Sequence, residues 1–222
     1  MASQRATTTT RPAGAPGVDV VLVPVKDFGA AKARLSEALT PPRRATLARA
    51  MAARVISAGS PAPVWVVCDD PVVARFALEH GAEVCWTPGR GLNGAVGAAL
   101  ERAAEAGHAH AVIAHADLPF ARSLSSLVVP GCAVIVPDRH LDGTNVMAVP
   151  TGVGFRPSYG ARSSHRHAAE ARRLGLEVRT VDDPRLAWDV DTEADLWPPP
   201  DVGRWPDELP RPAPAEPCRA AP

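Results

Sequence analysis

Short apolar runs alternate with helical patterns along most of this 222-residue chain, and that alternation limits the folds it can adopt. Residues 19–25 and 63–68 are apolar runs bounded by turn residues, which is typical of strands. Residues 41–58 have a helical pattern, with Thr40 in the N-cap position and Gly59 after the end. Further strands are expected at 82–86, 109–114, 132–136, 145–149 and 177–181, and further helices at 71–80, 93–106 and 163–174.

This order of elements predicts βαβ units and a mostly parallel central sheet with helices on both faces. We therefore expect one Rossmann-like α/β domain of three layers over residues 18–197. Residues 1–17 are polar and rich in proline and glycine, which indicates a disordered leader. Residues 198–222 are dense in proline, which indicates an extended tail along the surface, with Trp205 as its only large apolar anchor.

The charge balance of the chain excludes broad electrostatic binding. Lys and Arg total 24, as do Asp and Glu, so the formal net charge is zero, which argues against nucleic acid or an anionic membrane as partner. No apolar run approaches the roughly 18 residues of a membrane span, and the N-terminus lacks a secretory pattern, so we expect a cytoplasmic protein. Cys68, Cys85 and Cys132 are expected to be buried, reduced thiols. A small charged ligand and a homo-oligomer both remain compatible with this composition.

Aspartates follow two strand-like segments that lie far apart in the sequence. Asp117 follows the apolar run at 109–114, and Asp189 and Asp191 follow another short apolar stretch. Residues at i and i+2 on an extended segment project to the same side, so Asp189 and Asp191 are expected to face one way. Ligands of such sheets bind at the carboxyl ends of strands, and Mg²⁺ prefers carboxylate oxygens. The pattern predicts a Mg²⁺ site, although Asp189 and Asp191 also suit a turn and a helix cap.

A loop of small residues with three cations, Lys26, Lys32 and Arg34, follows the first expected strand. Such a loop can surround a polyphosphate with backbone N–H groups and cationic side chains. The sequence GxxxxGK[ST] of a Walker A loop is absent. A solvated basic loop is the alternative.

Several motifs in order resemble those of one family of nucleotidyltransferases. They are Lys26 with Lys32, Arg34 and Leu35, then Gly91-Leu92-Asn93, Ala116-Asp117-Leu118-Pro119, Asp142-Gly143-Thr144-Asn145, Tyr159-Gly160-Ala161-Arg162-Ser163 and Asp189-Val190-Asp191-Thr192. Residues 18–197 resemble the 2-phospho-L-lactate/phosphoenolpyruvate guanylyltransferases of coenzyme F-420 biosynthesis, which have the nucleotide-diphospho-sugar transferase type of fold. The resemblance implies transfer of GMP from GTP to the phosphate of a three-carbon phosphorylated acid, with release of diphosphate.

The resemblance also implies residue roles. Asp117, Asp189 and Asp191 would hold Mg²⁺. Lys26, Lys32 and Arg34 would contact the triphosphate, and Asn93 would contact the nucleoside. Thr144, Gly160 and Ser163 would bind the acid, and the catalytic residues would be Asp117, Lys26 and Lys32. Ser163 opens an expected helix, where backbone N–H groups favour an anion.

Several of these residues also have structural readings. Ser163 and Asn93 suit helix N-caps, and Thr144 suits the start of a strand. His165 and His167 lie two apart on a helix and face different ways, so we expect surface or packing roles rather than zinc binding. Arg162 departs from the small residue usual in the family's acceptor loop, which leaves the acid's identity open.

Two other function classes remain. A nucleotidyltransferase with a molybdopterin or sugar-phosphate acceptor is one, although the glycine-rich loop typical of that group is absent after the first strand. A non-catalytic nucleotide-binding protein of the same fold is the other.

Overall fold

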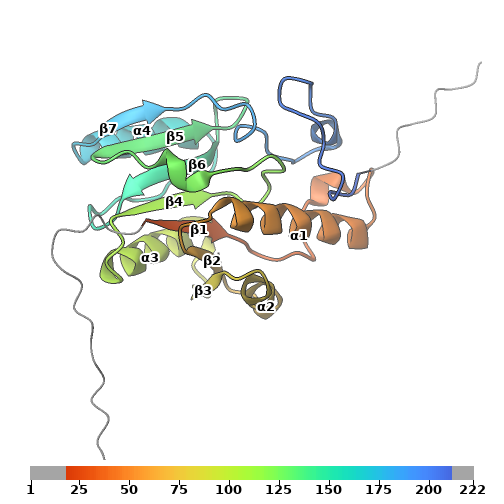
Figure 1. Cartoon of the computed structure of the whole chain (residues 1–222), viewed down its shortest axis with the longest axis horizontal. Helices are drawn as coiled ribbons and strands as arrows, with labels where there is room; N and C mark the ends of the chain where they lie inside the picture. The colour runs from red at the N-terminus through yellow and green to blue at the C-terminus, as the bar shows by residue number, and fades with distance from the viewer. Residues whose placement is uncertain (1–18, 212–222) are drawn as a thin grey trace, which may run out of the picture.

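The computed structural model describes residues 19–211. A seven-stranded sheet with the strand order β3-β2-β1-β4-β6-β5-β7 forms the centre of the molecule (Figure 1). Its strands are β1 (Val20–Pro24), β2 (Val64–Cys68), β3 (Glu83–Trp86), β4 (His110–Ala114), β5 (Cys132–Pro137), β6 (Thr144–Pro150) and β7 (Glu177–Thr180). Only β6 runs antiparallel to its neighbours β4 and β5, so the expected mostly parallel sheet is confirmed.

Helices cover both faces of the sheet, as the alternation of elements predicts. The helices are α1 (Pro41–Ala58), α2 (Pro71–Glu79), α3 (Gly91–Glu105) and α4 (Ser163–Arg173). Successive residues of β1 point to opposite faces: Val21 packs with the residues of α1 and α2, whereas Leu22 packs with those of α3 and α4. Because both faces are buried, inner strands such as β1, β2 and β5 are apolar throughout rather than alternating in polarity, whereas the edge strands β3 and β7 carry exposed polar residues.

The helix ends refine the sequence expectations. Helix α1 has the predicted bounds, and Thr40 is its N-cap residue by backbone conformation, although its side chain makes no capping hydrogen bond. Helix α3 begins at Gly91, two residues before the expected start, and Arg90 is its N-cap residue. Asn93 therefore lies inside the first turn, and its reading as an N-cap is wrong.

The proline-rich segment after the last short helix packs onto the domain. Trp205 and Leu209 are buried in a third apolar cluster together with Leu35, Phe120 and Val190. Trp205 is thus not the only large apolar anchor of this segment, because Leu209 shares that role. The expected leader, 1–17, and the last part of the expected tail, 212–222, lie outside the described residues.

Two smaller expectations can also be compared with the structure. Cys68, Cys85 and Cys132 are buried, free thiols, as expected. None of the helices in the described part of the chain is long and apolar enough to cross a membrane.

Candidate active site

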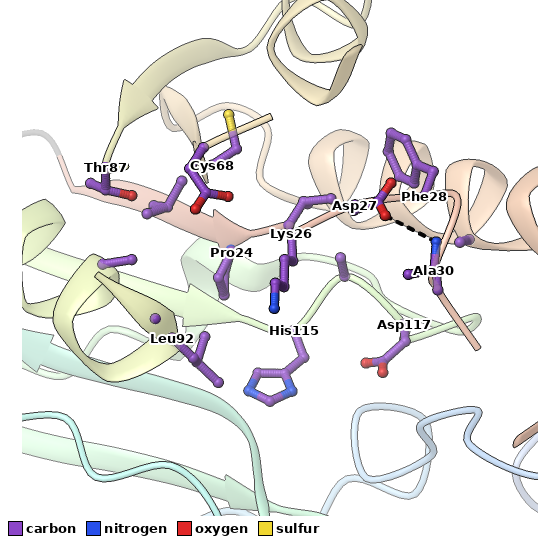
Figure 2. A pocket seen from close by; sticks show the side chains of 18 of the residues that line it. Pro24, Lys26, Asp27, Phe28, Ala30, Cys68, Thr87, Leu92, His115 and Asp117 are labelled. Atoms are coloured by element: carbon purple, nitrogen blue, oxygen red, sulfur yellow. Dashed lines mark hydrogen bonds between the residues drawn. The ribbon is translucent and has the colours of Figure 1, made fainter. Parts of the chain in front are cut away.

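A cavity of about 820 Å³ opens at the carboxyl ends of β1, β2 and β4, next to the first turn of α3 (Figure 2). Lys26 follows β1, Asp69 follows β2, and His115 and Asp117 follow β4, while Leu92 comes from α3; all five line the cavity. The volume lies in the range of about 300–1,000 Å³ that is usual for small-molecule sites. The cavity therefore sits where the strand order predicts a ligand site.

One wall of the cavity carries paired charges. Lys32 Nζ lies 2.6 Å from Asp117 Oδ2 and 3.3 Å from Asp191 Oδ1. Burial alone would raise the pKa of Asp117, but the nearby Lys32 ammonium outweighs it and holds that pKa below its ordinary value. Burial likewise opposes the charged form of Lys32, whereas Asp117 and then Asp191 raise the pKa of its ammonium group. Lys32 and Asp117 are therefore both charged near neutral pH.

Asp189 completes this acidic group. Its pKa is raised, first by burial and then by the negative charge of Asp117, with a smaller effect of Asp191. Asn145 Nδ2 lies 3.4 Å and Arg139 Nη1 3.6 Å from Asp189 Oδ1. The structure thus brings the three predicted aspartates close enough for their charges to affect one another. Together with Lys32 they are called the charged wall below.

The charged wall is not arranged as a metal cage. No group of three or more His, Cys, Asp or Glu side chains within residues 19–211 is placed to hold a metal ion. Lys32 accounts for this at the charged wall, because its ammonium group bridges two of the aspartates. One ligand atom remains free: Asp117 Oδ1 is buried and has no hydrogen-bond partner.

A buried ion pair holds the loop that carries Asp189 and Asp191. Asp195 Oδ2 accepts hydrogen bonds from the N–H of Asp191 at 2.8 Å and of Thr192 at 2.6 Å, in a capping box. Asp195 Oδ1 pairs with Arg139, which also donates to the carbonyl of Asp189 at 3.1 Å. The Asp195 side chain is only 2% exposed. One carboxylate and one guanidinium therefore fix the backbone of both aspartates.

Neither Arg139 nor Asp195 was singled out from the sequence. The three-residue spacing from Thr192 to Asp195 is a capping-box signal that identifies Asp195. Arg139 carries no local signal, because its partner lies 56 residues away. His115 was also missed: it lines the cavity, and its Nε2 is buried without a hydrogen-bond partner.

A second polar region lies outside the cavity lining, where β6 begins and α4 starts. Thr144 and Ser163 are 2% and 1% exposed, and their hydroxyl oxygens lie 3.3 Å apart. His167 Nδ1 lies 3.0 Å from Thr144 Oγ1, and His167 Nε2 accepts from the N–H of Ser158 at 2.8 Å. Since a backbone N–H can only donate, the proton of the neutral ring is on Nδ1, which donates to Thr144. Thr144, Ser163 and His167 are called the hydroxyl corner below.

The hydroxyl corner is electrically neutral. Burial, with the charges of Arg166 and His115 adding to it, lowers the pKa of His167 to about 4. His167 is thus a packed core residue and His165 an exposed one, so the two histidines face apart as expected.

The start of α4 differs from its expected form. The N-cap residue is Arg162, in a left-handed conformation with φ of 55°, so the reading of Ser163 as N-cap is wrong. The N–H of Ser163 donates to Gly160 at 3.0 Å, and that of Arg162 to the Asp142 carboxylate at 3.0 Å. These amides are occupied by the protein itself. An anion at this corner would therefore be bound by the hydroxyl groups rather than by these amides.

The remaining predicted site residues lie outside the charged wall and the hydroxyl corner. Arg34 is 76% exposed at its side chain and lies 3.6 Å from Asp191. Asn93 is outside the cavity lining: its Oδ1 accepts from the N–H of Tyr159 at 2.6 Å. Gly160 has φ of 115°, and a Cβ there would lie 3.3 Å from Arg166 Nη2, so glycine suits this position. The nucleoside role of Asn93 and the acid-binding role of Gly160 stay predictions.

Comparison with known proteins gives this arrangement a family. A family model described as "Guanylyl transferase CofC like" matches residues 19–198. A protein of Sphaerobacter thermophilus named phosphoenolpyruvate guanylyltransferase is 36% identical over 187 residues, which cover 80% of this chain and 90% of the relative. A Phenylobacterium zucineum protein named 3-phospho-D-glycerate guanylyltransferase is 35% identical over 179 residues, covering 74% and 82%.

A solved structure supports the fold. A protein from Desulfovibrio desulfuricans, described as a nucleotide-diphospho-sugar transferase, superposes with a TM-score of 0.67 at 22% identity and covers 81% of this chain and 85% of its own. At this identity the likeness concerns the fold alone. The sequence matches cover the strands, the cavity and the charged wall, and on that ground the chain belongs to the family of CofC-like guanylyl transferases.

Proposed function

We propose that this protein transfers GMP from GTP to the phosphate of a three-carbon phosphorylated acid and releases diphosphate, a step of coenzyme F-420 biosynthesis. The observation that carries the proposal is the charged wall, where a buried lysine and aspartates meet beside a cavity of nucleotide size. The guanylyltransferase names of the relatives support GTP as donor and a small phosphorylated acid as acceptor.

The cavity is the proposed nucleotide site. Transfer at a phosphorus atom depends on positioning and charge neutralisation more than on a strong base. Lys26 and Lys32 line the cavity, and Arg34 lies at its charged wall, so these cations can share the charge of a triphosphate. Lys32 would hold that charge next to Asp117, which follows β4.

Asp117, Asp189 and Asp191 are the proposed ligands of Mg²⁺. The fit is chemical: all three supply the oxygen ligands that Mg²⁺ prefers, and Asp117 Oδ1 is a buried carboxylate oxygen without a partner, which costs free energy unless a donor or cation meets it. When bound, the ion would neutralise phosphate charge during transfer. Arg139, Asn145 and Asp195 orient these aspartates through the contacts described above.

The hydroxyl corner is the proposed site of the acid. Because His167 donates to Thr144, the Thr144 hydroxyl keeps its own proton available for an oxyanion. Ser163 adds a second hydroxyl 3.3 Å away. Phosphoenolpyruvate, 2-phospho-L-lactate and 3-phosphoglycerate all carry a phosphate and a carboxylate that such donors can meet. Arg162 is exposed beside this corner, where its cation can select among the acids.

An acceptor screen tests the proposal. The protein is incubated with GTP, Mg²⁺ and one of the three acids at a time, and mass spectrometry follows the guanylylated acid while a coupled assay follows diphosphate. One acid should give both products in equal amounts. GTP binding without any product would instead favour a non-catalytic binding protein, and product with a sugar phosphate alone would favour a different nucleotidyltransferase.

A further inference from the structure

The two lysines of the cavity lie in different electrostatic surroundings. Lys26 is exposed, and its ammonium group points toward His115 (Figure 2). The Lys32 side chain is 11% exposed, and its ammonium group lies within hydrogen-bond distance of Asp117 and Asp191. One buried ammonium group thus bridges two of the three aspartates assigned to the metal, whereas Lys26 contacts none of them.

Lys32 and a divalent ion compete for the same two carboxylates. A nitrogen–oxygen distance of 2.6 Å marks a strong, charge-assisted hydrogen bond between Lys32 and Asp117. An ion bound to Asp117 Oδ1 and to an oxygen of Asp191 would lie a short distance from the ammonium group, and two cations repel each other strongly in a partly buried site. The ion and the ammonium group cannot both keep these contacts.

Cations already neutralise most of the negative charge of the wall without an ion. Asp117, Asp189 and Asp191 meet Lys32, and also Arg34 and Arg139 at 3.6 Å each, although Arg139 is shared with Asp195. Adding a bare divalent cation leaves this group with excess positive charge. Adding the same cation with a nucleotide brings a triphosphate as well, which gives Lys32 a new anionic partner in the adjoining cavity.

We infer that Lys32 is an internal counter-cation, which excludes a bare divalent ion from Asp117 and Asp191 and yields its place when the ion arrives with the nucleotide. The inference rests on the proposed function and extends it, since it names the residue that couples metal binding to nucleotide binding. Such a coupling is reciprocal: the factor by which GTP tightens the metal is the factor by which the metal tightens GTP.

The backbone at Lys32 offers a clean way to remove the charge. Lys32 has φ of 57°, in the left-handed region that costs free energy for any residue with a Cβ. Lys32→Gly therefore removes the cation and relieves the backbone. Lys32→Met removes the cation but keeps most of the length and volume of the side chain. The two variants share only the loss of the ammonium group, and Arg179→Met, which removes an exposed cation of β7 outside the cavity, is the control.

Binding of Mn²⁺, used as a paramagnetic stand-in for Mg²⁺, is measured by electron paramagnetic resonance with and without GTP, at slightly alkaline pH and without any acid acceptor. Without GTP, Lys32→Met and Lys32→Gly should bind Mn²⁺ about tenfold tighter than the unmodified protein, because the ion no longer has to break a charge-assisted hydrogen bond. Arg179→Met should bind it as the unmodified protein does. GTP should tighten Mn²⁺ strongly in the unmodified protein and much less in the two Lys32 variants.

Equal or weaker Mn²⁺ binding by both Lys32 variants would overturn the inference. The same conclusion would follow if Asp117→Asn left Mn²⁺ binding unchanged, since the ion would then lie elsewhere. This readout needs no turnover. If the protein guanylylates no acid but shows the expected Mn²⁺ pattern, the proposed reaction is refuted and the inferred role of Lys32 still holds.

Discussion

The charged wall and the hydroxyl corner are both polar, but they differ in how the fold satisfies them. At the charged wall, opposite charges neutralise one another beside an open cavity, and one carboxylate oxygen of Asp117 is left without a partner. In the hydroxyl corner, Thr144 and His167 are buried, neutral and joined by a directed hydrogen bond. The wall can exchange its cation for another one, whereas the corner carries no charge and can offer an anion only hydrogen bonds from its hydroxyl groups. That contrast suits a metal-bound nucleotide on one side and a small acid on the other.

Removing the carboxylate of Asp117 should have the largest effect. Asp117→Asn keeps the shape of the side chain but removes the charge that faces Lys32, so guanylyl transfer should fall by roughly three orders of magnitude. Steady-state rates with GTP and the preferred acid measure it. Asp207→Asn, at an exposed ion pair, should leave the rate unchanged. Near-normal turnover of Asp117→Asn would show that the charged wall is not the reacting centre.

Breaking the ion pair behind the charged wall should have the next largest effect. Asp195→Asn weakens the hold on Arg139 and on the loop of Asp191, and should weaken metal binding by about 10- to 100-fold, as loss of a residue that orients a metal ligand usually does. It should also lower the free energy of unfolding by about 3 kcal/mol, because Arg139 loses its buried partner. Mn²⁺ titration and denaturant unfolding measure the two effects.

The matched control is Glu177→Gln, which removes one half of an exposed ion pair with Arg179. Because solvent screens this exposed pair, neither measurement should change appreciably. If Asp195→Asn lowered stability but left metal affinity unchanged, the pair would serve the fold alone.

Removing the hydroxyl of Thr144 should affect the acid and spare the nucleotide. Thr144→Val should raise the KM of the acid by about tenfold, since one hydrogen bond to an oxyanion is lost, and should leave the KM of GTP near its original value. Thr151→Val is the control at the other end of β6, where the hydroxyl bonds a backbone carbonyl. Equal changes in both KM values for Thr144→Val would remove the distinction between the two regions.

The last effect concerns acid stability through His167 and involves neither substrate. Its pKa is about 4 in the folded protein against 6.5 ordinarily, so the unfolded chain binds the extra proton between these values. Stability from the neutral ring is therefore complete above pH 6.5 and is lost as the pH falls toward 4, by about 3 kcal/mol in total. Urea unfolding over this range measures the loss. His167→Gln should be less sensitive to pH, and an unchanged pH dependence would contradict the assignment.

Much of the fold followed from local patterns, because burial on both faces of a parallel sheet leaves short apolar runs that are easy to locate. The rule that ligands bind at strand ends also placed Lys26 and Asp117 beside one cavity. The features that could not be predicted depend on backbone conformation or on contacts between residues that lie far apart in the sequence. The left-handed Arg162 displaces Ser163 from the cap, and nothing near Arg139 indicates Asp195 as its partner. His167 was expected to pack, but its bond to Thr144 required the fold.

The central claim is that the charged wall and the hydroxyl corner act on one reaction, and ³¹P NMR of a single reaction mixture tests it most directly. With GTP, Mg²⁺ and the preferred acid, the unmodified protein should form a mixed diphosphate and free diphosphate in equal amounts. Asp117→Asn should form neither, and Thr144→Val should form both only at raised acid concentration. Consumption of GTP without a mixed diphosphate, or identical behaviour of all three proteins, would contradict the account.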